Sequence, residues 1–182
     1  MNREVARQGM HLVFTTTLAI TSVFLSQPWF VLLTAFFLVW LLWFIRARPE
    51  SKFFLRIMER PHDEQRFPGK GAIMVLVGAL IVAVLFPAHI LPALLVLGIG
   101  DSLSTIVGMR FGKKKVFGTK KSWVGSGTFF VCSAVILIFF STYWLLIALL
   151  ATVSEFVNYH SFLLIDDNLI IPLVVGVLLS LL

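Results

Sequence analysis

One carboxylate lies inside an apolar stretch of this chain: Asp101, in the run LGIGDSLST at residues 97–105. An aspartate within a transmembrane helix costs roughly 2.5–3.5 kcal/mol on insertion scales, so such a position favours a function. Aspartate also offers the hard oxygen atoms that Mg²⁺ prefers. Asp101 is therefore our first candidate catalytic group and metal ligand. The alternative is that it only bonds neighbouring hydroxyl groups.

A loop rich in lysine and glycine follows, with the sequence FGKKKVFGTKKSWVGSG at residues 111–127. Lysine charges and exposed backbone N–H groups at the start of a helix together can hold phosphate groups, and an upstream aspartate with Mg²⁺ favours a nucleotide polyphosphate. A basic membrane flank without a ligand is the open alternative. The candidate binding residues are Lys113, Lys115, Lys120, Lys121, Ser122, Gly125 and Ser126.

Further acids lie towards the end of the chain, at Glu155, Asp166 and Asp167. Carboxylates suit Mg²⁺ rather than zinc, and no His/Cys spacing indicates a transition metal. We predict Asp101, Glu155 and Asp167 as metal ligands, with Asp167 also a catalytic candidate. Asp166 and Asp167 could instead cap the last helix through its N-terminal dipole.

Near the start of the chain, Glu4, Arg7 and His11 are spaced i, i+3 and i+7, which places them on one helix face. His11 is the third catalytic candidate, because a histidine there could accept a proton from an alcohol. It could equally bond Glu4 or a backbone carbonyl.

Composition indicates which elements must position these groups. Of the 182 residues, 59% are hydrophobic and 13% are charged. A globule of this size cannot hide so much apolar surface from water, which excludes a soluble domain and a disordered chain. The single cysteine, Cys132, excludes a disulfide scaffold. What remains is an integral membrane protein.

The apolar runs lack period-two alternation, so they predict helices rather than barrel strands. We expect an all-α, polytopic transmembrane helical bundle of about seven transmembrane helices, forming one catalytic domain over 1–182. Residues 51–60 predict a further amphipathic helix on the cytosolic membrane surface, or else a solvated connector. The approximate spans are 10–26, 28–45, 71–87, 90–109, 124–141, 143–159 and 168–182.

The basic residues orient this bundle. Seven crossings place all 15 Lys and Arg on one side, and the positive-inside rule makes that side cytosolic. The N-terminus and the candidate site are therefore expected at the cytosolic face, in the plasma membrane if the source is prokaryotic. The net charge of +6 then reflects both topology and a site for a polyanion.

All candidate groups converge at this cytosolic end. A transporter or channel needs polar groups through the whole membrane thickness, which this chain lacks. The distribution favours chemistry between a water-soluble polyphosphate and a lipid. The chain has no GxxxxGK[ST] motif and no protein-kinase motif set, so neither familiar architecture holds the nucleotide.

The central motif, GDSLSTIVGMRFG followed by KKSWVGS, resembles the signature of the CTP-dependent lipid-alcohol kinases. That family contains dolichol (polyprenol) kinase, phytol kinase and the CTP-dependent diacylglycerol kinase. The E-x-x-R-x-x-x-H pattern ending at His11 and the stretch from Glu155 to Pro172 fall in the family's order, so the resemblance covers nearly the whole chain.

The resemblance implies an essential role for Asp101 and a CTP site that includes Lys121, Ser122, Gly125 and Ser126. The family often has Glu where this chain has Val124. Any role of that carboxylate is lost here or taken by Glu155.

The implied reaction transfers the γ-phosphoryl group of CTP to the hydroxyl of a membrane lipid alcohol, giving a lipid phosphate and CDP, with Mg²⁺ as cofactor. The alcohol could be a polyprenol or dolichol, phytol or a similar isoprenoid, or diacylglycerol. Expected partners are CTP, the alcohol and membrane lipids. Nucleic acid is not among them, and a homodimer is left open.

Two alternatives come from other reactions or classes. A CTP:phosphatidate cytidylyltransferase has a similar Gly-Asp and lysine-rich segment, but this chain lacks the histidine-glycine-glycine segment and paired acids expected near its C-terminus. A lipid flippase or other non-catalytic transporter would need polar groups in the outer half of the bundle, which the sequence does not provide.

Overall fold

The computed structural model describes residues 3–47, 69–116, 121–156 and 166–182. These residues form helices and turns without a β-strand, apart from one isolated bridge between Lys115 and Ser122. The helical elements are α1 Arg3–Phe24, α2 Gln27–Ala47, α4 Lys70–Leu85, η1 Pro87–His89, α5 Ile90–Leu95, η2 Val96–Asp101, α6 Ser102–Phe111, α7 Trp123–Leu137, α8 Trp144–Ser154 and α9 Asp167–Leu181.

The all-helical class predicted from the apolar runs is confirmed for the described residues, and every predicted span contains a helix. Two predicted spans, 124–141 and 143–159, are longer than the helices found, because α7 ends at Leu137 and α8 ends at Ser154. Turns over 138–143 replace the predicted helix ends there. The predicted surface helix 51–60 lies outside the described residues.

Helix length alone does not establish seven crossings. Among the described helices, α2 and the continuous stretch Pro87–Phe111 are long and apolar enough to cross a membrane. The apolar helices α4, α7, α8 and α9 are shorter than the about 20 residues of a full crossing. The seven-span topology therefore stays a prediction.

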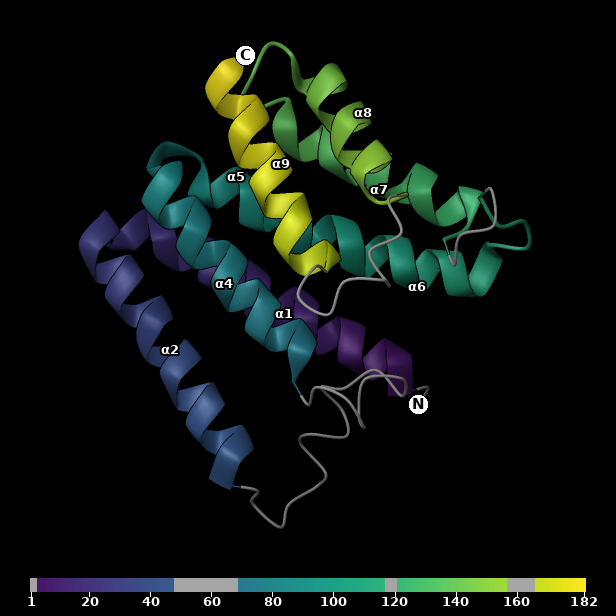
Figure 1. The fold of residues 1–182 in the computed structure, drawn as a ribbon. Helices are drawn as coiled ribbons and strands as arrows, with labels where there is room; N and C mark the ends of the chain where they lie inside the picture. Colours follow the sequence, from purple (N-terminus) through teal and green to yellow (C-terminus); the bar gives the residue numbers. More distant parts are fainter. Residues whose placement is uncertain (1–2, 48–68, 117–120, 157–165) are drawn as a thin grey trace.

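The helices pack so that α4 lies between α2 and α9, while α1 lies against the stretch from α5 to α6 (Figure 1). Helix α7 packs against α6 on one side and α8 on the other. Small residues allow these approaches: a Cβ on Gly98 would lie 3.1 Å from the Thr15 side chain, and a Cβ on Gly125 would lie 2.9 Å from the Ser104 carbonyl oxygen. The buried site residues are thus held by closely packed backbones.

The stretch Pro87–Phe111 changes its helical winding at Val96–Asp101, which is a π-helical turn. Such turns insert an extra residue into an α-helix and are frequent at functional sites. Here the turn ends at Asp101, which is 4% exposed. The change in helical winding therefore coincides with Asp101, our first candidate catalytic group.

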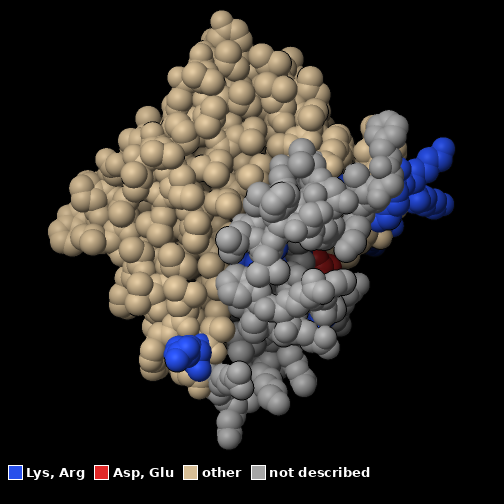
Figure 2. All heavy atoms as spheres, viewed as in Figure 1, with Lys and Arg blue, Asp and Glu red and all other residues tan. Residues whose placement is uncertain are grey.

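Charge and apolar surface separate along the bundle. Apart from Asp101, which lies within the stretch Pro87–Phe111, the described charged residues lie at the starts of α1, α4 and α9, at or just after the ends of α2, α6 and α8, and next to the start of α7. On the face shown in Figure 2, blue atoms lie mainly at the lower left and at the right, red atoms lie right of centre, and the remaining described surface of this face is uncharged. That surface exposes large side chains, such as Trp29 at 65% and Phe139 at 81%. The predicted one-sided charge distribution is present in the described residues.

Candidate functional site

Three carboxylates from separate elements surround one ammonium group. The Lys121 Nζ lies 3.0 Å from Glu155 Oε1, 3.1 Å from Asp167 Oδ2 and 3.4 Å from Asp101 Oδ1. Lys121 comes just before α7, Asp101 ends η2, Glu155 follows α8 and Asp167 begins α9. Residues up to 66 positions apart thus meet in what we call the acidic centre: Asp101, Lys121, Glu155 and Asp167.

Burial makes the charges of this centre interdependent. The side chains of Glu155 and Asp101 are 0% and 5% exposed, and that of Lys121 is 24% exposed. Burial by itself would lower the pKa of the Lys121 ammonium, but the carboxylates of Asp101, Asp167 and Glu155 outweigh it and raise this pKa above its usual value. Lys121 is therefore a permanent cation among three acids.

The N-terminal helix brings a histidine to the opposite side of Asp101. His11 Nε2 lies 3.9 Å from Asp101 Oδ2, and the two side chains are 11% and 5% exposed. Glu4 receives a hydrogen bond of 3.1 Å from Arg7 Nε. The structure thus places His11 beside Asp101 and pairs Glu4 with Arg7.

The alternative interpretation of Asp101, that it only bonds neighbouring hydroxyl groups, also differs from what the structure shows. The hydroxyl of Ser104 donates to the backbone carbonyl of Asp101 at 3.0 Å. The carboxylate itself extends towards Lys121 with one oxygen and towards His11 with the other. Asp101 is thus a bridge between two ionisable side chains.

The predicted metal ligands come together, though around an ammonium. Asp101, Glu155 and Asp167 all face Lys121, and within the described ranges no group of three or more His, Cys, Asp or Glu side chains is arranged to hold a metal ion. The chemistry of the donor set fits Mg²⁺, since all three are hard oxygen ligands. In addition, the buried Oε2 of Glu155 has no hydrogen-bond partner among the described residues.

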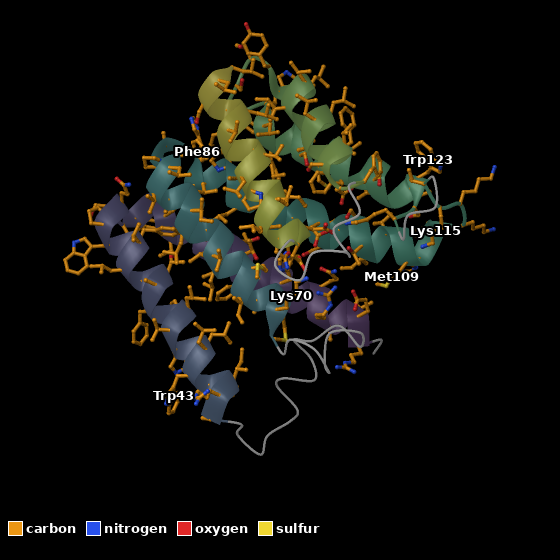
Figure 3. The ribbon with its side chains drawn as sticks, viewed as in Figure 1. Trp43, Lys70, Phe86, Met109, Lys115 and Trp123 are labelled. Atoms are coloured by element: carbon orange, nitrogen blue, oxygen red, sulfur yellow. The ribbon has the colours of Figure 1, made fainter. Side chains whose placement is uncertain are left out.

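The predicted phosphate-binding loop borders a cleft between α6 and α7. Its lining includes Lys115, Lys121, Ser122 and Gly125 from the predicted set, together with Ser104, Thr105, Gly108 and Met109 of α6. Figure 3 shows Met109, Lys115 and Trp123 at this end of the molecule, where α6 ends and α7 begins. We call this space the lysine cleft.

Two of the described predicted binding residues, Lys113 and Ser126, do not line the lysine cleft. Lys113 is exposed, and the predicted residue Lys120 lies outside the described residues. Ser126 is 3% exposed, and its hydroxyl lacks a hydrogen-bond partner in the described part of the chain. Ser126 is thus buried behind the cleft wall.

The expectation of open N–H groups at the start of α7 needs correction. Ser122 caps this helix, and its hydroxyl accepts a hydrogen bond of 3.1 Å from the Gly125 amide. The Trp123 amide donates to the Lys114 carbonyl at 3.2 Å. These bonds therefore occupy first-turn amides that we expected to face a phosphate, and the cationic groups that line the cleft are Lys115 and Lys121.

The sequence left open whether Asp166 and Asp167 cap the last helix or Asp167 joins the other acids. In the structure the two residues differ in this respect. Asp166 is the N-cap, and its side chain accepts a 3.1 Å hydrogen bond from the Asn168 amide. Asp167 reaches Lys121 instead. Asn168, for which we predicted no role, donates its side-chain amide to the Gly71 carbonyl at 3.1 Å and so ties α9 to α4. The position of Asn168 directly after two acids was the feature of the sequence that could have indicated its role.

Sequence reasoning also missed the central place of Lys121. We predicted this lysine as a phosphate-binding residue, whereas it is also the common partner of every predicted metal ligand. A lysine-rich loop offers no means of telling which lysine folds inward. The only available signal was its position directly before a helix cap.

These features define a largely apolar helical protein in which a buried acidic centre lies between a lysine-lined cleft and the first helix. The uncharacterized protein MJ1137 of Methanocaldococcus jannaschii is 33% identical over 185 residues, which cover 98% of this chain and 93% of that protein. This chain belongs to the same family as that archaeal protein. No family model matches this chain, and no solved structure gives a significant match to it.

Plant proteins share part of the sequence. A probable chloroplastic phytol kinase 1 of Oryza sativa is 33% identical over 132 residues, covering 63% of this chain and 41% of that protein. A probable chloroplastic phytol kinase of Triticum aestivum is 39% identical over 94 residues, covering 41% of this chain and 30% of that protein. The matched region thus spans less than half of each plant relative.

Proposed function

We propose that this protein is a lipid-alcohol kinase that transfers the γ-phosphoryl group of CTP to the hydroxyl of a membrane lipid alcohol. The partial similarity to plant proteins named as probable phytol kinases supports a kinase of this kind. The choice of CTP as donor rests on the resemblance of the central motif to CTP-dependent lipid-alcohol kinases. The proposed acceptors are polyprenol, phytol or a similar isoprenoid, and diacylglycerol.

One observation carries the proposal: the two carboxylate oxygens of Asp101 face different partners. Oδ1 faces Lys121, which lines the lysine cleft, and Oδ2 faces His11 on α1. A polyphosphate in the cleft and an alcohol beside α1 would therefore approach the same carboxylate from two sides. Phosphoryl transfer needs such an approach, because the attacking and leaving oxygens lie roughly in line.

In the proposed reaction the hydroxyl oxygen of the alcohol forms a bond to the γ-phosphorus, and the bond from that phosphorus to the β,γ-bridging oxygen breaks. CDP leaves, and the proton of the alcohol passes to a base. We assign this role to His11 rather than Asp167, because His11 lies beside Asp101 whereas Asp167 contacts Lys121. Lys121 and Lys115 would neutralise phosphate charge, which is the main catalytic requirement of a loose transition state.

Asp101, Glu155 and Asp167 would hold Mg²⁺, whose charge would balance the phosphates of the nucleotide. The unpartnered Glu155 Oε2 and the shared orientation of these acids support the assignment. We expect chelation of divalent cations to stop the transfer and added Mg²⁺ to restore it.

The proposal places the protein in a membrane with its acidic centre on the cytosolic side. The charge at one end, the apolar surface elsewhere, and the two helices that meet the length and hydropathy of a crossing support this. Seven crossings would require the short helices to span with their flanking turns. A lipid alcohol would then reach the centre from the bilayer and CTP from the cytosol.

The products distinguish this proposal from its rivals. Purified protein in nanodiscs would be given CTP, Mg²⁺ and a panel of lipid alcohols, with ATP, GTP and UTP as alternative donors. A kinase releases CDP and a lipid phosphate, whereas a cytidylyltransferase given phosphatidate releases pyrophosphate. Release of neither product under any combination would overturn the proposal.

The residue test is Asp101→Asn, which keeps the shape of the side chain and removes its charge. We expect at least a hundredfold loss of kcat in a variant that still folds. The matched control is Thr34→Val, a near-isosteric change at a buried α2 residue whose hydroxyl bonds the Phe30 carbonyl, far from the acidic centre in the sequence. Near-normal turnover in Asp101→Asn would contradict the role of this carboxylate.

A further inference from the structure

An apolar groove adjoins the acidic centre on the side of His11. Three helices form its walls: α1 contributes Met10, His11 and Phe14, α2 contributes residues from Phe37 to Phe44, and α4 contributes residues from Gly71 to Leu76. Helix α2 packs on α4 and makes few contacts with α1. We call this space the α1–α2 groove.

The polar lining of the groove is confined to a few side chains near the charged end of the bundle. Arg7 and His11 come from the first turns of α1, and Asn168 comes from the first turn of α9. The other lining side chains are apolar, and Trp40 and Phe44 stack with ring centroids 5.6 Å apart. The groove therefore suits a ligand with a small polar head and an apolar tail.

Charge indicates which head group fits. Arg7 is paired with Glu4, so it offers little net positive charge to an anion. Asp101 lies 3.9 Å from His11 and would repel a phosphate carried by a phospholipid. A neutral hydroxyl meets neither obstacle, because it can donate to or accept from the imidazole of His11.

The size of the groove limits how much tail it can hold. The α2 wall from Phe37 to Phe44 is about 10 Å long at 1.5 Å per residue. An extended backbone covers roughly 3.5 Å with three bonds, so about nine bonds of a tail fit within this length. The remainder of a longer tail would lie outside the groove.

We propose that the α1–α2 groove binds the hydroxyl end of a neutral, single-chain alcohol, with its hydroxyl beside His11 and only about the first nine bonds of its tail enclosed. This inference rests on the proposed kinase function for its chemistry. It adds the location of the acceptor and a selectivity. The protein would select among alcohols by the structure of the chain near the hydroxyl, and the length of the chain beyond the groove would not affect binding.

The first experiment measures binding without turnover. A long-chain alcohol that carries a diazirine on a carbon near the hydroxyl is irradiated with the protein in nanodiscs, and the labelled peptides are identified by mass spectrometry. We expect labels on α1, α2 or α4 at the groove, with at least fivefold less labelling when the unlabelled alcohol is in excess. Labelling only on the outward face of α2, or labelling that excess alcohol does not reduce, would overturn the groove.

The second experiment fills the groove with Ala72→Trp, and with Ala72→Leu should the larger variant fail to fold. We expect the KM for the alcohol to rise at least tenfold while the KM for the nucleotide is unchanged. Val39→Trp is the matched control, because Val39 is 66% exposed on α2 and does not line the groove. Equal KM values for the groove variant and this control would overturn the inference.

Chain length gives a third readout. Alcohols of ten, twenty and more carbons should have kcat/KM values within about threefold of one another at equal membrane mole fraction, and a five-carbon alcohol should fall at least tenfold below them. A steady increase with length beyond ten carbons would overturn the limited enclosure. Groove labelling without transfer to any alcohol would overturn the kinase function alone, and transfer without groove labelling would overturn the groove alone.

Discussion

At the scale of single residues, Lys121 determines whether the two buried acids Asp101 and Glu155 and the partly buried Asp167 can coexist. Its ammonium is within 3.4 Å of each partner carboxylate. Removing one member of a buried ion pair leaves an uncompensated charge and costs about 3–5 kcal/mol. The stability of the acidic centre and its chemistry therefore depend on the same side chain.

We predict that Lys121→Met lowers the free energy of unfolding by about 3 kcal/mol, because three carboxylates then face one another without a cation. The double variant Lys121→Met/Glu155→Gln should recover much of this loss. Denaturant titration in detergent, arranged as a double-mutant cycle, measures the coupling. Lys113→Met, at an exposed lysine, is the control, and an equal effect of the two lysine changes would refute the prediction.

Residue types and spacing allowed the identities in this centre to be predicted, but not their arrangement. Asp101, Glu155 and Asp167 were singled out as acids near apolar runs, and the structure brings them together. The position of Lys121 between them depends on tertiary packing of four elements, which no local pattern encodes. The capping of α7 by Ser122 was missed because a Gly-Ser-Gly segment also suggests an open phosphate cradle.

At the scale of elements, the close approach of α6 and α7 shapes the lysine cleft. A Cβ on Gly125 would lie 2.9 Å from the Ser104 carbonyl oxygen and 3.1 Å from the Ser122 hydroxyl. Gly127 is two residues further along the same helix and would place its Cβ in open space. Gly125 and Gly127 therefore allow a matched test. The same substitution is made in the same helix, and only the contact with α6 and Ser122 differs.

We predict that Gly125→Ala weakens nucleotide binding at least tenfold, because the helices must separate to admit the methyl group. Gly127→Ala should bind nucleotide normally and gain about 0.4–1 kcal/mol in unfolding free energy, as expected for a helical glycine without steric constraint. Isothermal calorimetry with CTP and Mg²⁺ measures the first effect. Similar affinities for the two variants would contradict the proposed importance of this contact.

Apolar runs predicted the existence of each described helix because burial of twenty or so apolar residues has few structural solutions. They did not predict the π-helical turn at Val96–Asp101, since one turn with i→i+5 in place of i→i+4 hydrogen bonds leaves no distinct apolar pattern in so short a stretch. Nor did they predict that α7 stops at Leu137, because the residues that follow are as apolar as those within the helix.

At the scale of the whole molecule, the segregation of charge predicts an orientation in the membrane. Apart from Asp101, the described charged residues lie at or beside one set of helix ends, and the turn around Tyr143 joins the opposite ends of α7 and α8. In the proposed membrane topology, the positive-inside rule would make the charged end cytosolic. The two ends should therefore differ in their accessibility from outside the cell.

We predict that Tyr143→Cys, in a Cys132→Ser background, is labelled by a membrane-impermeant maleimide in intact bacterial cells. Lys113→Cys should be labelled only after the membrane is permeabilised. Both positions are exposed in the structure, so failure to react would reflect compartment rather than burial. The reverse pattern of labelling would contradict the proposed topology.

The divided orientation of the Asp101 carboxylate has a consequence for steady-state kinetics. One oxygen faces Lys121 of the lysine cleft and the other faces His11 of the α1–α2 groove, so the two proposed substrates occupy separate spaces. Neither substrate has to depart before the other enters, and no residue needs to store the phosphoryl group in between. Double-reciprocal plots at several fixed alcohol concentrations should then intersect, whereas a phosphoenzyme that alternates between substrates would give parallel lines.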